Sequence, residues 1–375
     1  MKMRVCMISS VDMNAPYGST TRPYYISKNL VEFGCEILHI CTKPPEIEEV
    51  GIRYSPKKYH KNKLWVIRTC RDIFRIYREC KSFAPDVLYV HQISNATRAL
   101  PLKYLLKKPL VYDEHGSYLL DINPRKKDLL WEQTVLKMAD KVIVVTNDVK
   151  EVFTKIYRVP EEKIATIGDG VNTNLFKPME RNKKLKDKLG IYGDKVVVFT
   201  CPRGSPANNL ALEYFFNLVP KIENKIKNIK FIIIGGGSQI NPPSKSVIYT
   251  GFVRDIVSYI NLADVCIAPY PSSAVCGTSG AKNKVIEYFA CGKPVVSTRE
   301  GIRGFNDAVP DRDFLLASDS NDFIDKLLTV LYDENLSKKL GENARKLSLK
   351  YDWRDLSKEV LHVLKQVVRH NGEKL

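Results

Sequence analysis

The sequence lacks most of the features that would place it outside the class of ordinary globular proteins. No apolar run approaches the roughly 18 residues that a membrane-spanning helix needs, and the basic start MKMRVCMISSVDM has too short an apolar segment for a signal peptide. The nine cysteines include no C-x-x-C pair, and their odd number argues against a disulfide framework and against a zinc site. We therefore expect a cytoplasmic chain with free thiols.

Acidic residues are also scarce relative to basic ones. The chain has 59 Lys and Arg residues against 42 Asp and Glu residues, a formal net charge of +17, and residues 51–100 alone hold 11 basic and 3 acidic side chains. Such an excess suits an anionic lipid surface, a nucleic acid or a phosphorylated small molecule as partner. The alternative is a solvated basic surface without a partner.

Short β-branched runs alternate with amphipathic stretches along the whole chain, an order typical of parallel, doubly wound sheets. In the first half, the predicted strands are RVCMISS, EILHICT, DVLYVHQ, PLVYDEH, KVIVVT and IATIGDGV, and the predicted helices cover 20–33, 64–83 and 127–138. In the second half, the predicted strands are KVVVFTC, KFIIIGGG, SVIYTGFV, DVCIAPY, KPVVST and FLLAS, and the predicted helices lie near 210–223, 255–262, 321–350 and 353–369.

A lysine-rich segment with little apolar content, FKPMERNKKLKDKLGIYGDK, separates the two halves and is typical of a linker, or of a linker with a first helix. At 375 residues, the chain exceeds the size at which one hydrophobic core stops growing. We predict an α/β protein of two Rossmann-like domains, 1–175 and 176–352, whose strand ends face one cleft.

Residues directly after the predicted strands are the candidates for ligand contacts, because open parallel sheets bind ligands beyond the carboxyl ends of their strands. Gly18 lies between the first strand and helix, where the missing Cβ lets the backbone approach a ligand. An ordinary loop glycine is the alternative. His91 and His115 each follow a strand. A structural role is favoured for His91, and a loop histidine bonded to local backbone is the alternative for His115.

Two lysines stand where a helix begins in GTSGAKNKVIEYFACGKPVVST, residues 277–298. The N-terminal end of a helix carries partial positive charge and usually attracts Asp or Glu. A phosphate bound there would explain Lys282 and Lys284, because backbone N–H groups and two ammonium groups would then point at it. Glu287, one turn further, would accept hydrogen bonds from hydroxyl groups of the same ligand. The alternative is a solvent-facing Lys284–Glu287 pair.

Four arginines recur at spacings of three, four and three residues in IRTCRDIFRIYREC, which places them on one face of a helix. They are Arg68, Arg71, Arg75 and Arg78. Ile67, Phe74 and Tyr77 are expected elsewhere around this helix. A solvated face is the favoured interpretation, and the alternative is contact with anionic phospholipid or with a lipid-linked phosphate.

Several segments, in the right order over most of the chain, resemble the family 4 retaining glycosyltransferases of the GT-B fold, also described as glycosyltransferase group 1. NKVIEYFACGKPVVST resembles the donor-site helix of that family, and GFVRDIVSYINLADVCIAPY and REGIRG resemble the segments around it. IGDGVNTNLFKP is similar to the motif that closes the family's N-terminal domain. YDWRDLSKEVLHVL resembles the C-terminal helix that crosses back, which implies that 353–375 completes domain 1–175.

The resemblance implies a nucleotide-sugar donor, UDP- or GDP-linked, bound without a metal or another cofactor. His115 matches a histidine beside the donor sugar and Glu287 the glutamate that binds the nucleotide ribose, so these two are the implied catalytic residues. The implied donor and nucleotide contacts are Gly18, Arg203, Val253, Ser279, Gly280, Lys282, Asn283, Lys284 and Glu287. Two departures bear on the donor. Ser279 stands where the family usually has the first of two glutamates, and Arg203 alone remains of an Arg/Lys pair, so Lys282 and Lys284 are expected to take over the phosphate role.

We expect a glycosyltransferase that moves a sugar to an acceptor hydroxyl of a glycan or a lipid-linked molecule with retention of configuration. It would act in the cytoplasm, or at the inner face of the membrane, without nucleic acid as a partner. Three alternatives stay open. A related epimerase would have its own acidic and histidine residues in the cleft, and no independent set is seen. A basic polyanion-binding protein would interleave aromatic residues with its basic run as stacking platforms, and we predict that the aromatic residues here are not interleaved in this way. A transferase-like protein that has lost activity is compatible with Ser279.

Overall fold

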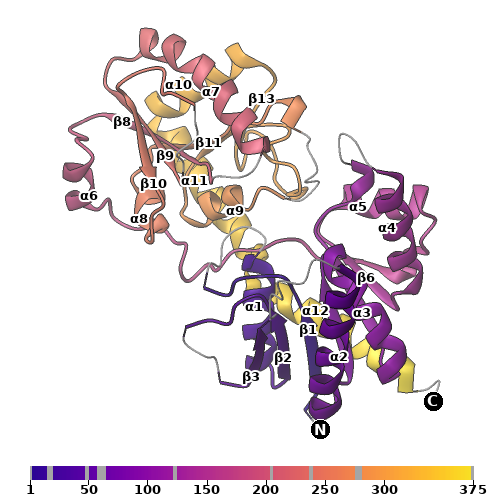
Figure 1. Cartoon of the computed structure of the whole chain (residues 1–375). Helices are drawn as coiled ribbons and strands as arrows, with labels where there is room; N and C mark the ends of the chain where they lie inside the picture. Colours follow the sequence, from indigo (N-terminus) through magenta and orange to yellow (C-terminus); the bar gives the residue numbers. More distant parts are fainter. Residues whose placement is uncertain are drawn as a thin grey trace. The chain divides into compact units, whose positions relative to one another are not determined.

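The computed structural model describes residues 2–14, 20–46, 50–56, 65–120, 125–202, 206–235, 240–274 and 281–372. The chain forms two compact units (Figure 1). Unit 1 contains the described residues through Asp169 and those from Trp353 onward, and unit 2 contains the described residues from Gly170 to Asp352. Each unit is built on one parallel sheet with helices, so the predicted fold class is confirmed.

Unit 1 has a seven-stranded sheet in the order β3-β2-β1-β4-β5-β6-β7. All six neighbouring pairs are parallel. The strands are β1 (Arg4–Ile8), β2 (Glu36–Cys41), β3 (Ile52–Pro56), β4 (Val87–His91), β5 (Leu110–Glu114), β6 (Lys141–Val144) and β7 (Ile164–Thr166). The central strands are buried on both faces, which explains why they read as almost continuous apolar runs.

Helices cover both faces of this sheet (Figure 1). Val5 and Met7 of β1 pack with α1 and α12, whereas Cys6 and Ile8 pack with α2, α3 and α4, because alternate side chains of a strand point to opposite faces. The helices of unit 1 are α1 (Thr21–Glu32), α2 (Trp65–Phe83), α3 (Ile93–Leu106), η2 (Tyr118–Leu120), α4 (Lys126–Met138), α5 (Asn147–Glu151), the π-helical η3 (Val152–Ile156), η4 (Glu161–Lys163) and α12 (Trp353–Gly372).

Unit 2 has a six-stranded parallel sheet in the order β10-β9-β8-β11-β12-β13. Its strands are β8 (Lys195–Thr200), β9 (Ile229–Ile234), β10 (Val247–Gly251), β11 (Val265–Ala268), β12 (Val295–Thr298) and β13 (Leu315–Ala317). Its helices are α6 (Lys183–Lys188), α7 (Pro206–Lys225), α8 (Ile256–Asn261), η5 (Ser272–Ala274), α9 (Asn283–Ala290), α10 (Ser320–Tyr332), α11 (Glu334–Ser348) and η6 (Leu349–Tyr351).

The segment that enters unit 2 is held by the end of α11. The Arg345 guanidinium donates hydrogen bonds to the backbone carbonyls of Phe176 (2.9 Å), Ala290 (2.8 Å) and Thr173 (3.1 Å). The Thr173 hydroxyl in turn donates to the carboxylate of Asp352. The entry to unit 2 and its exit toward α12 are therefore tied together within unit 2.

Most predicted elements are found within a few residues of their expected bounds, and four differ. The strand β3, the helix α3 and the helical stretch formed by α5 and η3 were not predicted. The single helical stretch predicted over 321–350 is two helices, α10 and α11, separated at Asp333, whose carboxylate accepts a hydrogen bond from the Leu336 N–H at 2.9 Å. Among the described residues, no helix combines the length and the apolar character that crossing a membrane requires.

Candidate active site

The predicted donor helix is α9 of unit 2, and its first turn lies where the carboxyl ends of the strands are. Lys282 is the N-cap residue, and its ammonium lies 5.2 Å from the ring centroid of Tyr270, two residues beyond β11. The first turn of a helix leaves backbone N–H groups without an acceptor within the helix. The two predicted lysines therefore lie at an electropositive helix end, as the phosphate interpretation requires.

The structure overturns one of the two sequence interpretations of Lys284, the solvent-facing pair with Glu287. The Lys284 side chain is only 9% exposed, so it is not part of such a pair. Its ammonium donates hydrogen bonds to the Oδ1 of Asn208 (2.9 Å) and to the hydroxyl of Tyr270. It also lies 5.0 Å from the centroid of the Phe199 ring. Lys284 is thus a buried cation whose hydrogen-bond acceptors are neutral.

Burial changes the titration of both charged residues of α9. The pKa of Lys284 is lowered from 10.5 to about 8, mainly by desolvation; Lys282 also lowers it, whereas Cys201 and Glu287 raise it. Desolvation raises the pKa of Glu287 to about 7, and Lys284 opposes that change. Glu287 is only half-buried, and no partner for its carboxylate is found in the part of the chain that the structure describes. It remains available to accept hydrogen bonds from a ligand.

Sequence reasoning missed the two neutral partners of Lys284. Asn208 lies in the first turn of α7, and its Oδ1 also accepts a hydrogen bond from the Tyr270 hydroxyl at 2.6 Å. Thr200, at the end of β8, is buried, and its hydroxyl has no partner among the described residues. Thr200 is the last residue of β8, and Tyr270 follows β11. Both therefore lie where the rule that ligands bind beyond strand ends predicts ligand contacts.

The structure describes only some of the remaining predicted donor contacts. Val253 follows β10 and is half-buried against the core of unit 2, and Asn283 is the first residue of α9, with a buried Oδ1 that has no partner among the described residues. The other predicted donor contacts, Gly18, Arg203, Ser279 and Gly280, lie outside the described residues.

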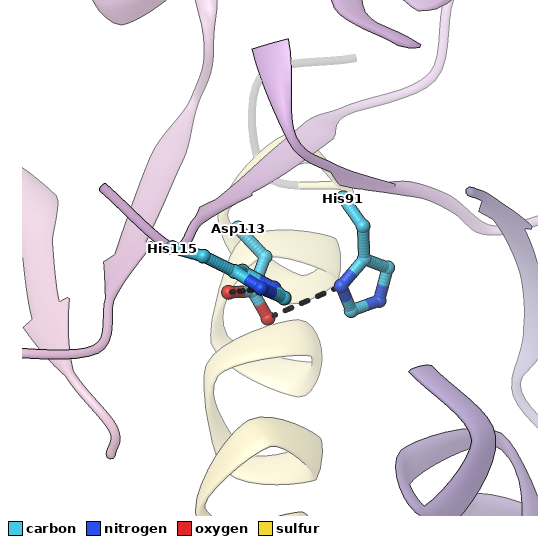
Figure 2. Close-up of side chains that lie close together, drawn as sticks. All are labelled: His91, Asp113 and His115. Atoms are coloured by element: carbon cyan, nitrogen blue, oxygen red, sulfur yellow. Dashed lines mark ion pairs between the residues drawn. The ribbon is translucent and has the colours of Figure 1, made fainter. Parts of the chain in front are cut away.

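In unit 1, the predicted His115 lies beside a second histidine and a carboxylate (Figure 2). The Nδ1 of His91 is 3.7 Å from the Oδ2 of Asp113, and the Nε2 of His115 is 3.9 Å from its Oδ1. Asp113 and His91 lie at the carboxyl ends of β5 and β4, and both are buried. Both ring nitrogens of His91 lack a hydrogen-bond partner in the described structure, as does the Nε2 of His115. The structural role favoured for His91 therefore lacks the hydrogen bonds that would support it.

A buried arginine, Arg22, stabilises the negative charge of Asp113. The Nε of Arg22 lies 3.0 and 3.1 Å from the two carboxylate oxygens, and Tyr89 donates a further hydrogen bond. Burial would raise the pKa of Asp113, but Arg22 and the two histidines hold it below its ordinary value. Burial lowers the pKa of His91 and of His115, which favours the neutral form of both imidazoles.

Two histidines and a carboxylate also suggest a metal site, since one ligand atom of each lies within 4.8 Å of the others. The charge of this cluster argues against that interpretation. Both oxygens of Asp113 already accept hydrogen bonds from Arg22, and a divalent cation there would lie beside a guanidinium group. Neutral imidazoles with unpartnered nitrogens, next to an arginine–carboxylate pair, instead suit the hydroxyl groups of a ligand.

The loop that carries His115 is held by two buried carboxyl groups. Glu114 accepts hydrogen bonds from the N–H groups of His115 (2.9 Å) and Gly116 (3.3 Å). Glu132 of α4 accepts from the hydroxyl of Ser117 (3.0 Å) and the N–H of Tyr118 (3.1 Å). Burial and the nearby Glu132 raise the pKa of Glu114 to about 8.

The predicted arginine face lies on α2, and the structure corrects two expectations. Arg71 and Arg78 are exposed, but Arg75 is half-buried and donates to Ser55 and Glu79; the side chain of Arg68 lies outside the described residues. Ile67 (43% exposed) and Phe74 (63%) do not lie elsewhere around the helix. They share the exposed face with Arg71 and Arg78, because residues three, four and seven apart lie on one side of a helix. The prediction that aromatic residues are not interleaved with the basic run is therefore wrong at Phe74.

Each of the two units matches a model of a known family. The model of the family described as Glycosyltransferase Family 4 matches residues 17–175, and the model of Glycosyl transferases group 1 matches residues 194–333. The chain is 24% identical over 358 residues to a putative glycosyltransferase, EpsD, of Bacillus subtilis, with 88% of each chain covered.

Two solved structures show the same fold. The sucrose-phosphate synthase of Thermosynechococcus elongatus has a TM-score of 0.77 at 15% identity, with 98% of this chain and 100% of that chain covered. Anabaena HepE in complex with UDP and glucose has a TM-score of 0.75 at 15% identity, with coverages of 97% and 100%. Because the two family models together match most of both units, the chain belongs to the group 1, family 4 glycosyltransferases and has the GT-B fold.

Proposed function

We propose that this glycosyltransferase takes a sugar from a nucleotide-sugar donor and transfers it to an acceptor hydroxyl with retention of the anomeric configuration. One observation carries the proposal. The ammonium of Lys284 is buried beside the first turn of α9 with only neutral hydrogen-bond acceptors, at the strand ends where parallel sheets bind ligands. A buried cation without a counterion is costly, and a bound diphosphate would supply the missing negative charge.

In this proposal, α9 performs electrostatic catalysis. Lys282, Lys284 and the first backbone N–H groups of α9 would stabilise the negative charge that develops on the leaving diphosphate. Such groups are fixed before the reaction, so they stabilise the transition state without being reorganised. The half-buried carboxylate of Glu287 would accept hydrogen bonds from the ribose hydroxyls.

The sugar and the acceptor would meet the histidine cluster of unit 1. A neutral imidazole offers one donor and one acceptor, which matches a sugar hydroxyl. His115, held by the Glu114 loop, would contact the donor sugar. The acceptor, a hydroxyl of a glycan or of a lipid-linked molecule, would attack on the face from which the diphosphate departs, and the leaving phosphate would take its proton. The resident groups named here need no metal or further cofactor.

Anabaena HepE, which shares the fold, binds UDP and glucose in its solved complex, and this supports uridine nucleotide sugars as the first donors to test. The purified protein would be incubated with UDP- and GDP-sugars and a panel of glycan and lipid-linked acceptors. Release of nucleoside diphosphate, together with the anomeric proton signal of the first product, measures both turnover and stereochemistry.

We expect one donor to give a product with the anomeric configuration of the donor. An inverted product would overturn the retaining mechanism. Nucleotide binding without turnover on any donor would favour the inactive transferase that Ser279 left open. Interconversion of two free nucleotide sugars would favour the epimerase.

A further inference from the structure

The exposed face of α2 combines cationic and apolar side chains. Ile67 and Phe74 are seven residues apart and therefore lie two turns apart along one side of the helix. Arg71 lies between them, and Arg78 and Lys81 follow within the next two turns, all three exposed. The opposite side of α2 packs on the sheet through buried Ile76 and Cys80. We call the exposed set Ile67, Arg71, Phe74, Arg78 and Lys81 the α2 face.

A shallow pocket adjoins the α2 face and adds two further arginines. It has a volume of about 380 Å³ and is lined by Arg53 of β3 and by Phe74, Arg75, Arg78, Glu79 and Ser82 of α2. The Nη1 of Arg75 is bonded to Ser55 at 2.7 Å and to Glu79 at 3.1 Å, whereas its Nε and Nη2 are buried and have no partner among the described residues. Guanidinium groups from two elements thus converge beside one aromatic ring, with Glu79 the single acid.

We propose that the α2 face docks the protein on an anionic phospholipid bilayer. Phe74 and Ile67 enter the interface between headgroups and acyl chains, and Arg71, Arg78 and Lys81 contact the lipid phosphates. The pocket of Arg53, Arg75 and Arg78 receives one headgroup phosphate, because guanidinium groups bind phosphate with directed, charge-assisted hydrogen bonds.

The apolar residues decide between a bilayer and a nucleic acid. A single-stranded nucleic acid would need several aromatic platforms for successive bases, and the α2 face offers one aromatic ring. Its second exposed apolar residue, Ile67, cannot stack on a base. Transfer of the Ile67 side chain from water to the acyl-chain boundary is favourable, however. The inference concerns unit 1 alone and is independent of the donor chemistry.

Cys70 provides a probe at the rim of the α2 face. It is exposed, whereas every other cysteine that the structure describes is buried. An environment-sensitive fluorophore would be attached to Cys70 in a Cys276→Ser background, since Cys276 lies outside the described residues. The labelled protein would be titrated with vesicles of phosphatidylcholine alone and with vesicles containing roughly one third phosphatidylglycerol.

We expect a blue-shifted emission and co-sedimentation with the phosphatidylglycerol vesicles only, both reversed at high ionic strength. The double variant Arg71→Gln/Arg78→Gln should bind these vesicles about ten-fold or more weakly, and Phe74→Ser several-fold more weakly. The matched control is Lys184→Gln/Lys188→Gln on exposed positions of α6, which makes the same change of net charge in unit 2 and should bind like the unchanged protein.

Three results would overturn the proposal. The first is unchanged vesicle binding by the α2 variants, and the second is co-sedimentation without a change in emission at Cys70, which would place the contact on another surface. The third is binding of a single-stranded oligonucleotide through Arg71 and Arg78, with the vesicles left unbound. Because the substituted side chains are exposed, equal thermal midpoints of all variants would show that folding is not the cause.

Discussion

The positive charge of Lys284 destabilises the folded protein as long as no anion is bound beside it. Burial removes the hydration of its ammonium, and Asn208 and Tyr270 replace water with neutral dipoles. Lys282 adds a second positive charge nearby, which lowers the pKa of Lys284 further. A diphosphate at the start of α9 would reverse these effects together, which is why we place the donor there.

Replacing Lys284 with methionine should weaken nucleotide binding by about 10- to 100-fold, because a charge-assisted hydrogen bond contributes roughly 1.5–3 kcal/mol. Isothermal titration with the preferred nucleotide measures the loss. Lys293→Met is the matched control. Lys293 is half-buried, and its ammonium donates to the backbone carbonyls of Asn261 (2.8 Å) and Ala263 (3.1 Å). That variant should lose stability and keep its nucleotide affinity, and equal losses of affinity would contradict the role of Lys284.

The titration of Lys284 predicts a pH effect of defined sign. Its pKa is about 8 in the folded protein and 10.5 as the ordinary value, so the unfolded chain binds more protons between these pH values. The free energy of unfolding therefore rises with pH in this window, and below pH 8 the buried charge costs on the order of 3 kcal/mol. Nucleotide affinity should change in the opposite direction, decreasing above pH 8 as the cation is lost.

Urea unfolding of the unchanged protein and of Lys284→Met tests this linkage. At pH 7, the variant should gain stability from removal of the buried charge, after allowance for the altered packing. The difference between the two proteins should shrink by roughly 2 kcal/mol between pH 7 and pH 9.5. A difference that does not vary with pH would show that Lys284 titrates normally.

At the residue scale, the sequence predicted where the charges lie but not what surrounds them. Lys282, Lys284 and Glu287 follow from the spacing within one short segment. The burial of Lys284 depends on Asn208 and Tyr270, which are 76 and 14 residues away in the sequence. Likewise, Arg75 looks like part of an exposed stripe until Ser55 of β3 is placed beside it.

At the element scale, the loop after β5 depends on α4. Glu132 is 1% exposed and accepts hydrogen bonds from Ser117 and Tyr118, and the Tyr157 hydroxyl donates to it at 2.6 Å. Glu132 of α4 therefore holds the segment that directly follows His115 in place. Its negative charge also raises the pKa of Glu114, whose carboxyl group holds the His115 N–H.

Glu132→Gln should destabilise the protein by about 1–3 kcal/mol, because a buried hydrogen-bonded carboxylate is replaced by an amide that cannot accept all three hydrogen bonds. Urea unfolding measures this change. The same substitution at Glu151, whose side chain is 64% exposed and pairs with Lys155, should change stability by less than about 0.5 kcal/mol. A Glu132 variant as stable as the Glu151 variant would show that the loop does not depend on this carboxylate.

The elements that sequence reasoning missed have physical causes. The helix α3 contains Pro101, which normally interrupts a helix, and it follows a residue with positive φ, Gln92 (63°). The edge strand β3 ends at Pro56 and includes the exposed Arg53, so it lacks the apolar pattern of its neighbours. The break between α10 and α11 is the single residue Asp333, too short to interrupt an amphipathic pattern.

At the scale of the whole molecule, the last helix belongs to the first unit. Trp353, Val360 and Leu364 of α12 are buried in the core that α1 and one face of the unit 1 sheet share. The side-chain amide of Asn29 donates to the hydroxyl of Ser357 across this contact at 3.0 Å. The resemblance predicted this return of the chain, whereas composition and periodicity alone could not, because they do not tell which sheet a terminal helix covers.

The location of α12 predicts which unit a core substitution affects. Val360→Asp would bury an unpaired charge in unit 1 and should lower the stability of that unit by more than about 3 kcal/mol, seen as an earlier unfolding transition in calorimetry. Unit 2 should keep its transition. The control Lys365→Asp, on the exposed side of the same helix, should leave both transitions in place. A Val360 variant whose unit 2 transition moves instead would contradict the assignment of α12.

We propose above that a nucleoside diphosphate binds at the start of α9. The most direct test of this proposal is a thermal-shift screen of the protein with UDP, GDP, ADP and TDP and their common sugars, repeated on Glu287→Ala and Lys284→Met. We expect one nucleotide to raise the unfolding midpoint and both variants to lose most of this gain. No shift with any nucleotide, or an equal shift in the two variants, would contradict it.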